Sequence, residues 1–287
     1  MNSTRNLNKR LLNLFPVHLL KEEYKLTGKT DDLLEAITGG QTRQNIINFV
    51  FANHNFTKQH IYLFNLNKNF KPPANFDDFP LKVEKQVTNA NGEILLYCLP
   101  IVKFSVYLSD PMDKVEINFH QPVLISLKNK AVTVQYTKLE KNISFYFPTN
   151  RDAKKAAEIN SEEETLSKIL AYFNDDYTIS MCDINAGIKH LWDIDDLDCF
   201  RIAWQNPFSS VEEKMNGDLT FKKKYPKEYE KIILTPLGKS VWKYLLKDDY
   251  LCDVFAGDPS TGKLSITTFP KNVHQIKNVI TKILANN

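Results

Sequence analysis

The sequence predicts an α+β protein in which an N-terminal helical module is followed by an antiparallel β-sheet packed with C-terminal helices. In the first 70 residues, apolar side chains recur at spacings of three and four, which is typical of amphipathic helices. From residue 81, apolar and polar positions alternate and turns separate the runs, as in an antiparallel sheet. Helical spacing returns after residue 150. We therefore expect a helical module at 1–70, a linker at 71–80 and an α+β domain at 81–287.

The composition is that of a folded chain with a sizeable core. Of the 287 residues, 43% are hydrophobic, 11% aromatic and 25% charged, which excludes an intrinsically disordered protein. Only 9 glycines are present, which excludes a collagen-like or low-complexity chain. Nothing in the composition identifies a reaction.

The helical module is expected to contain five helices. Apolar side chains mark one face of the first helix, which stops before Pro16: Leu7, Leu11, Leu14 and Phe15. A second short helix follows from Val17 to Tyr24, and a fourth follows Thr42. The third helix, at 31–38, has Thr30 as its expected cap, an acidic first turn that suits the helix dipole, and a Gly-Gly end. The fifth is expected from Thr57 to Leu66.

Prolines and strand patterns follow the module. The segment from Phe70 to Pro80 contains three prolines and little periodicity, which indicates a linker. The dipeptide Asn91-Gly92 favours a type I′ hairpin turn and precedes a long apolar return run at 94–108. Later runs alternate around Ile117 and Val134, and 142–147 is expected as a last short strand.

The C-terminal part is expected to be helical, with one hairpin. Ser161 with Glu164 forms a capping box, and Ser209 with Glu212 repeats it. Pro226 and Pro236 each occupy a position suited to the start of a helix. A hairpin is expected around Asp258-Pro259, and a last helix should bury Val273, Ile276, Ile280 and Ile283.

Charge is unevenly distributed along the chain. Residues 1–75 carry ten basic and five acidic side chains (+5), whereas 151–205 carry six and twelve (−6), and 206–287 carry thirteen and nine (+4). A basic start and a basic end thus flank an acidic middle, although the whole chain is only +3.

The sequence favours a cytoplasmic protein without a membrane segment. No run of about 18 apolar residues is present, and polar residues interrupt the segment in which a secretory signal would lie. The four cysteines, Cys98, Cys182, Cys199 and Cys252, show no metal-type spacing, so we expect buried free thiols.

Motifs for nucleotide or metal chemistry are incomplete. Gly257 to Lys263 has the spacing of a phosphate-binding loop, but a strand-like run follows where such a loop requires a helix, so a hairpin turn is expected. The aspartates at 193, 195, 196 and 198 resemble the start of a calcium loop that lacks its glycine and glutamate, and a solvated turn is the favoured interpretation. The six histidines are dispersed. We predict no catalytic residue, no metal and no cofactor.

A basic stripe is expected on a C-terminal helix. Lys239, Lys243 and Lys247 recur every four residues, which would align their ammonium groups along one helical face. Such a stripe is either a solvated face or a contact for phosphates. Because 32 of the 37 basic residues are Lys, base-specific recognition by arginine is not indicated.

Residues 17–37 resemble the SAP motif, a helix–loop–helix DNA-binding element in which Leu-Lys-x-x leads to Gly-Lys-x-x-x-Leu-hydrophobic. The matching positions are Leu19, Leu20, Gly28, Lys29, Leu33, Leu34 and Ile37. The resemblance implies non-specific or A·T-leaning binding to the DNA backbone. Independently of the family, Gly28 allows a tight turn, and Lys29 lies beside the amides that begin the next helix, where a phosphate oxygen is favoured. Lys21, Lys25 and Arg43 could widen this positive surface.

We therefore expect a non-enzymatic, nucleic-acid-associated protein whose helical module holds the phosphate backbone and whose α+β domain binds protein partners. The expected nucleic-acid-binding residues are Lys21, Lys25, Gly28, Lys29, Thr30, Arg43, Lys239 and Lys243. Two alternatives remain open. One is an adaptor without nucleic-acid binding, in which 151–205 meets a basic partner. The other is a metal-dependent hydrolase, such as a nuclease, whose carboxylates converge in space.

Overall fold

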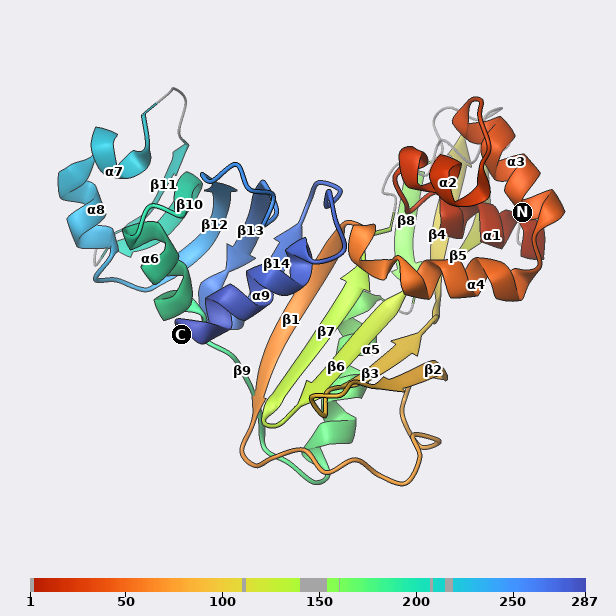
Figure 1. The fold of residues 1–287 in the computed structure, drawn as a ribbon, viewed down its shortest axis with the longest axis horizontal. Helices are drawn as coiled ribbons and strands as arrows, with labels where there is room; N and C mark the ends of the chain where they lie inside the picture. The colour runs from red at the N-terminus through yellow and green to blue at the C-terminus, as the bar shows by residue number, and fades with distance from the viewer. Residues whose placement is uncertain (1–2, 110–111, 140–153, 160, 207–208, 215–218) are drawn as a thin grey trace.

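The computed structural model describes residues 3–109, 112–139, 154–159, 161–206, 209–214 and 219–287. It has an α+β fold, as the sequence predicts: N-terminal helices, a long antiparallel sheet with a smaller second sheet, and C-terminal helices (Figure 1). The helical module lies at one end of the long sheet, and the C-terminal half of the chain forms the other end.

The helical module consists of α1 (Thr4–Leu12), α2 (Val17–Tyr24), α3 (Thr30–Gly40) and α4 (Arg43–Ala52), followed by the 3-10 helix η1 (His54–Phe56). Its core is formed by apolar residues from all four helices, together with Leu99 from the sheet region. Thr42 caps α4, because its hydroxyl accepts a hydrogen bond from the Asn45 amide at 3.2 Å. Thr30 is not a cap, since it is the first residue of α3 and Lys29 occupies the capping position.

Within the described residues, the long sheet contains 11 strands in the order β11-β10-β12-β13-β14-β1-β7-β6-β3-β2, with β9 paired to β1, and every pairing is antiparallel. The strands of its N-terminal half are β1 (Gln59–Leu66), β2 (Val83–Thr88), β3 (Ile94–Cys98), β6 (Val123–Lys128), β7 (Ala131–Thr137) and β9 (Ile179–Met181). Those of its C-terminal half are β10 (Leu197–Asn206), β11 (Ser209–Lys214), β12 (Leu237–Tyr244), β13 (Val254–Asp258) and β14 (Lys263–Ile266).

The smaller sheet lies beneath the helical module. It is formed by β5 (Met112–His120), β4 (Ile101–Ser109) and β8 (Lys154–Ile159), with its own apolar core around Phe104 and Phe119. The Arg10 guanidinium of α1 lies over the Phe119 ring, 5.2 Å from its centroid. The module is therefore held against this sheet by a cation–π contact as well as by apolar packing.

Helices cover opposite faces of the two halves of the long sheet (Figure 1). α6 (Asn185–Asp193) and α9 (Gln275–Ala285) pack on one face, where Ile61 and Leu63 of β1 join their core. α5 (Glu162–Asn174) packs on the other face, against Tyr62 and Phe64 of the same strand. Because successive side chains of a strand point to opposite faces, β1 is buried on both sides, and each half of the sheet keeps one face open.

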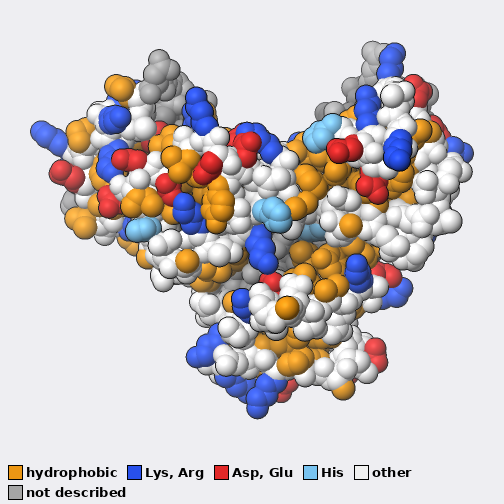
Figure 2. Space-filling view, viewed as in Figure 1, with side chains coloured by type: hydrophobic (Ala, Val, Ile, Leu, Met, Phe, Trp, Pro, Cys, Tyr) orange, Lys and Arg blue, Asp and Glu red, His pale blue; other side chains and the backbone are white. Residues whose placement is uncertain are grey.

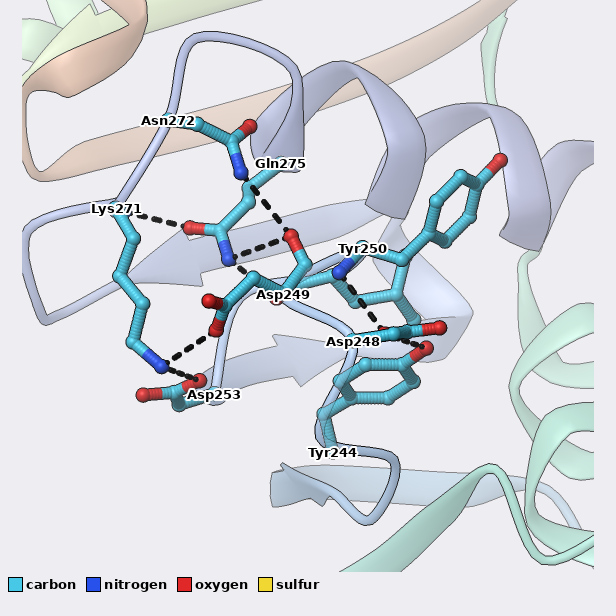
Figure 3. Close-up of polar contacts among 9 residues, drawn as sticks. Tyr244, Asp248, Asp249, Tyr250, Asp253, Lys271, Asn272 and Gln275 are labelled. Atoms are coloured by element: carbon cyan, nitrogen blue, oxygen red, sulfur yellow. Dashed lines mark hydrogen bonds and ion pairs between the residues drawn. The ribbon is translucent and has the colours of Figure 1, made fainter.

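The beginning of α9 is fixed by a polar network (Figure 3). The buried Gln275 side chain accepts from the Lys271 amide at 2.7 Å and donates to the carbonyls of Asp249 and Leu251. The Lys271 ammonium bridges Asp249 and Asp253, at 2.7 and 3.0 Å. These contacts tie the loop after β12 to α9, so this acidic loop has a structural role.

The structure corrects three predicted helices. The segment Thr57 to Leu66 forms β1, because its almost continuous apolar run reflects burial on both faces of a strand. Ser209 and Glu212 lie in β11 rather than in a capping box. Pro236 precedes β12 rather than a helix. The run at 94–108 is likewise divided at Leu99-Pro100 into β3 and β4, which belong to different sheets.

Several other expectations are confirmed. The Ser161 hydroxyl caps α5 by accepting from the Glu164 amide, and Pro226 begins α8 (Pro226–Ile232), which follows the short helix α7 (Phe221–Lys224). The hairpin around Asp258-Pro259 is formed by β13 and β14. The expected strand at 142–147 lies outside the described residues. In the expected linker, Phe76 and Phe79 are buried against α5, so this segment packs on the domain core.

Candidate functional site

The connection between α2 and α3 has the sharp bend that the sequence predicts. Lys25 has a φ of 52° and Gly28 a φ of +117°, and the latter conformation favours glycine. The side chains of Lys25 and Lys29 are exposed, and that of Lys21 is half-buried. The structure thus places these three lysines near the bend, as separate side chains on an exposed connection.

Carboxylates surround these lysines. Asp31 and Asp32 lie exposed in the first turn of α3, where their charge complements the helix dipole. Residues 17–37 contain three lysines against five acidic side chains, so their formal charge is −2. The carboxylates of Asp31 and Asp32 therefore already lie near the α3 amides at which a phosphate was expected. Thr30 lies half-buried at this point.

Arg43 does not widen this surface. Its guanidinium donates to the Asn8 side-chain oxygen at 3.0 Å and lies 2.9 Å from Nε2 of His120 on β5. Burial, followed by the charge of Arg43, lowers the pKa of His120, so that a neutral imidazole accepts this contact. Arg43 therefore joins α4 to the smaller sheet. On α1, Arg5 and Lys9 both pair with Glu35.

Lys239 and Lys243 lie on a strand, not on the helix that the sequence indicates. Both belong to β12, where Trp242 and Tyr244 point into the core and the lysines point outward. Residues four apart share a face of a helix, because a helical turn has 3.6 residues. They also share a face of a strand, because strand side chains repeat every two residues. The two lysines therefore still share a face, with Val241 between them.

This face carries a groove of about 500 Å³ on the side of the sheet opposite α6 and α9. Four strands line it, through Arg201, Lys239, Ser240, Val241, Ala256, Gly257, Asp258, Lys263, Leu264 and Ser265. Among the described residues that line the groove, Arg201, Lys239 and Lys263 are positively charged and Asp258 is negatively charged. The register Arg201↔Val241 places Arg201 directly beside the β12 face. Cations from three different strands thus meet in one concave surface.

A polar cluster borders the groove where β14 meets β1. Glu162, the first residue of α5, accepts from the Tyr62 hydroxyl at 2.8 Å and lies 3.0 Å from Nδ1 of His60. The Lys263 ammonium lies over the Tyr62 ring, 4.8 Å from its centroid. Burial alone would raise the pKa of Glu162, but the contacts with His60, Tyr62 and Lys263 outweigh it and lower that pKa. The cluster therefore holds an ionised carboxylate that orients Lys263 at the edge of the groove.

The segment Gly257 to Lys263 forms the β13–β14 hairpin, as expected; its tip is the 3-10 helix η3 (Pro259–Thr261), and it leads into β14 rather than into an α-helix. Gly262 has a φ of +60°, and a Cβ atom there would lie 2.6 Å from the Cys182 carbonyl oxygen. The glycine is therefore required by close backbone packing. Lys263, the last residue of the motif, contributes instead to the sheet groove.

The aspartate cluster after α6 is used internally. Lys222 contacts Asp195 at 3.3 Å, Lys282 pairs with Asp196, and Asp198 accepts from the Phe221 amide at 2.9 Å. Among the described residues, no group of three or more His, Cys, Asp or Glu side chains is arranged to hold a metal ion. All four cysteines are free and buried, as the sequence predicts.

Comparison with protein-family models found no match, and comparison with curated proteins found none either. In the part of the chain that the structure describes, every helix is too short or too polar to cross a bilayer.

Sequence reasoning missed three contributors to the groove region. Arg201, Lys263 and the His60–Glu162 pair come from segments far apart in the chain, and only strand pairing brings them together. One sequence signal could have identified Lys263: it alternates with Leu264 in the expected hairpin strand, which places Lys263 and Ser265 on the face opposite the apolar residues.

Proposed function

We propose that the protein is a non-enzymatic nucleic-acid-associated protein that holds the phosphate backbone on the open face of β10, β12, β13 and β14. The observation that carries the proposal is the convergence of Arg201, Lys239 and Lys263 in one groove, with Lys243 on the same face of β12. Clustered cations release counterions when they bind a polyanion, which supplies affinity without reading sequence.

The chemistry of the groove favours backbone contact over base contact. Ser265 offers a hydroxyl donor to phosphate oxygens, and lysine acts as a point charge without a fixed geometry. Tyr62, the aromatic residue beside Lys263, is buried and its ring is covered by that lysine, so it offers no face for stacking a base. We therefore expect little sequence preference.

The lysines of the α2–α3 connection serve as a second, weaker contact in this proposal. Lys25 and Lys29 are exposed and can reach a phosphate, but the neighbouring carboxylates of α2 and α3 reduce the local potential. They should therefore contribute less than the groove, both to the affinity and to its salt dependence.

Fluorescence anisotropy with a labelled 20-base-pair duplex, titrated at several salt concentrations, tests the proposal. If three to four phosphates are neutralised, log K should fall with log salt with a slope of roughly −3 to −4. Binding that does not depend on the salt concentration, or no binding at low salt, would overturn the proposal. Nicking of supercoiled plasmid with Mg²⁺ by the same protein would instead favour the hydrolase alternative.

A further inference from the structure

A second cleft lies on the opposite face of the sheet, in the half that α5 covers from behind. Its volume is about 450 Å³. α9 forms one wall, the β2–β3 turn another, and η1 lies at its upper end, as the lining residues Ile280, Glu93 and Asn55 show. Figure 2 shows a hollow between the helical module and the lower end of the sheet, with hydrophobic side chains within it.

The floor of the cleft is formed by cross-strand rows of β3, β6 and β7. One row is Tyr97, Leu124 and Gln135, and the next is Leu95, Ser126 and Thr133. The α9 wall adds Ile280 and Leu284. Apolar side chains therefore alternate with polar ones along the floor, as expected for a surface that receives a partly apolar ligand.

Two buried acceptors in the cleft lack a hydrogen-bond donor. Gln135 is only 7% exposed, and its side-chain oxygen has no partner among the described residues. The Asn55 side-chain oxygen is in the same situation. Leaving a buried polar atom unpaired is energetically unfavourable, and a ligand carrying N–H donors would remove that cost.

The charges around the cleft are predominantly positive. Lys277 of α9 pairs with Glu93 at 3.5 Å, which neutralises both groups. Lys128 is exposed at the end of β6, with no ion-pair partner among the residues described, and Lys85 lies over the Tyr97 ring. A ligand with negative charge is therefore favoured at this margin.

We propose that this cleft binds an extended segment of a partner protein that carries alternating apolar and acidic side chains. An extended peptide presents backbone N–H groups at regular intervals, which suits the oxygens of Gln135 and Asn55, and its apolar side chains would enter between Leu124 and Ile280. Its acidic residues would face Lys128. The cleft lies on the face opposite the basic groove, so this inference does not depend on nucleic-acid binding.

An array of immobilised heptapeptides of mixed composition, probed with the labelled full-length protein, tests this proposal. Bound peptides should be enriched in acidic residues alternating with Leu, Ile or Phe, and the best of them should bind in solution with saturation. Binders without such enrichment, or no saturable binder below millimolar concentration, would overturn it.

Three variants locate the binding. Ala131→Trp should fill the cleft and weaken the selected peptides at least tenfold, whereas Lys231→Glu on the distant helix α8 should leave them unchanged. Lys128→Glu should shift the selected peptides from acidic toward basic, a result that a purely structural lysine would not produce. Unchanged selectivity in that variant would contradict the proposal.

Gln135→Leu separates a ligand contact from a structural role. Because the Gln135 oxygen is unpaired in the free protein, its removal should leave the melting temperature unchanged or raise it, while peptide affinity falls. A variant that melts lower, with peptide affinity preserved, would show that Gln135 acts in folding alone.

Discussion

The helical module and the open face of the C-terminal half-sheet both carry lysines, but they place them differently. In the module, basic residues lie on separate turns and meet carboxylates: Arg5 and Lys9 pair with Glu35, and Lys29 precedes Asp31 and Asp32. On the sheet, cations from neighbouring strands point to one side. The excess charge of the first 75 residues is therefore a poor guide to where a polyanion would bind.

The physical reason for the difference is periodicity. A helix turns successive residues through all directions, so each charge meets a different neighbourhood. A strand directs every second residue to the same side, and its partners add rows of side chains about 5 Å apart. Few cations are needed on adjacent strands to build a concentrated field.

The C-terminal half of the sheet should be destabilised strongly when the contact between α6 and α9 is disturbed. In Gly187→Ala, the new Cβ on α6 would lie 2.1 Å from the Ile283 carbonyl oxygen of α9, so the two helices must separate. We expect a loss of about 3–5 kcal/mol in the free energy of unfolding. Hydrogen exchange should show lost protection in β10 to β14 with little change in α1 to α4.

The matched control for that variant is Gly40→Ala in the helical module. A Cβ there would meet no heavy atom within 4 Å, and the residue lies at the end of α3. Stability should be unchanged or rise by up to about 1 kcal/mol. Equal destabilisation by the two variants would refute the close α6–α9 contact.

The stability of the protein should depend on pH through a histidine that lies between the helical module and the long sheet. Burial lowers the pKa of His54, between α4 and β1, from 6.5 to about 4. The unfolded chain therefore binds this proton more readily, and stability should fall as the pH drops from 6.5 to about 4, by about 3 kcal/mol. Urea titrations across this range measure the loss. His54→Asn should reduce the pH dependence, whereas the exposed His274→Gln should retain it; the same slope in both variants would exclude His54 as its source.

Charge reversal compares the two basic regions directly. Lys239→Glu combined with Lys243→Glu should weaken duplex binding by at least tenfold and reduce the magnitude of the salt slope by about 2. Lys25→Glu combined with Lys29→Glu should weaken it by less, about threefold, because nearby carboxylates already limit those lysines. Anisotropy titrations measure the affinity of both double variants for the duplex. A larger loss in the Lys25/Lys29 variant than in the Lys239/Lys243 variant would indicate that the helical module is the main binding site.

The smallest effect is expected at the border of the groove. Glu162→Gln removes the negative charge beside Lys263 while keeping most of the side-chain volume. Duplex affinity should rise about twofold to threefold, and the free energy of unfolding should fall by about 1 kcal/mol as contacts with His60 and Tyr62 weaken. Lower affinity in this variant would show that the carboxylate assists binding.

Much of the local structure could be predicted from the sequence. The Ser161 cap, the hairpin around Asp258 and the buried cysteines follow from short-range chemistry. The sequence predicts a helix where β1 forms, because burial on both faces removes the alternation that identifies a strand. The sequence also predicts a helix where β12 forms, because the spacing of Lys239 and Lys243 fits the period of a helix as well as that of a strand.

Local sequence patterns were enough to predict the α+β class, the four N-terminal helices and the shared face of Lys239 and Lys243, since each depends on residues close together in the chain. The contact of Arg43 with His120, and the meeting of Arg201 and Lys263 with the β12 lysines, depend instead on long-range packing. Strand order determines such meetings, and it results from the packing of the whole sheet against helices on opposite faces.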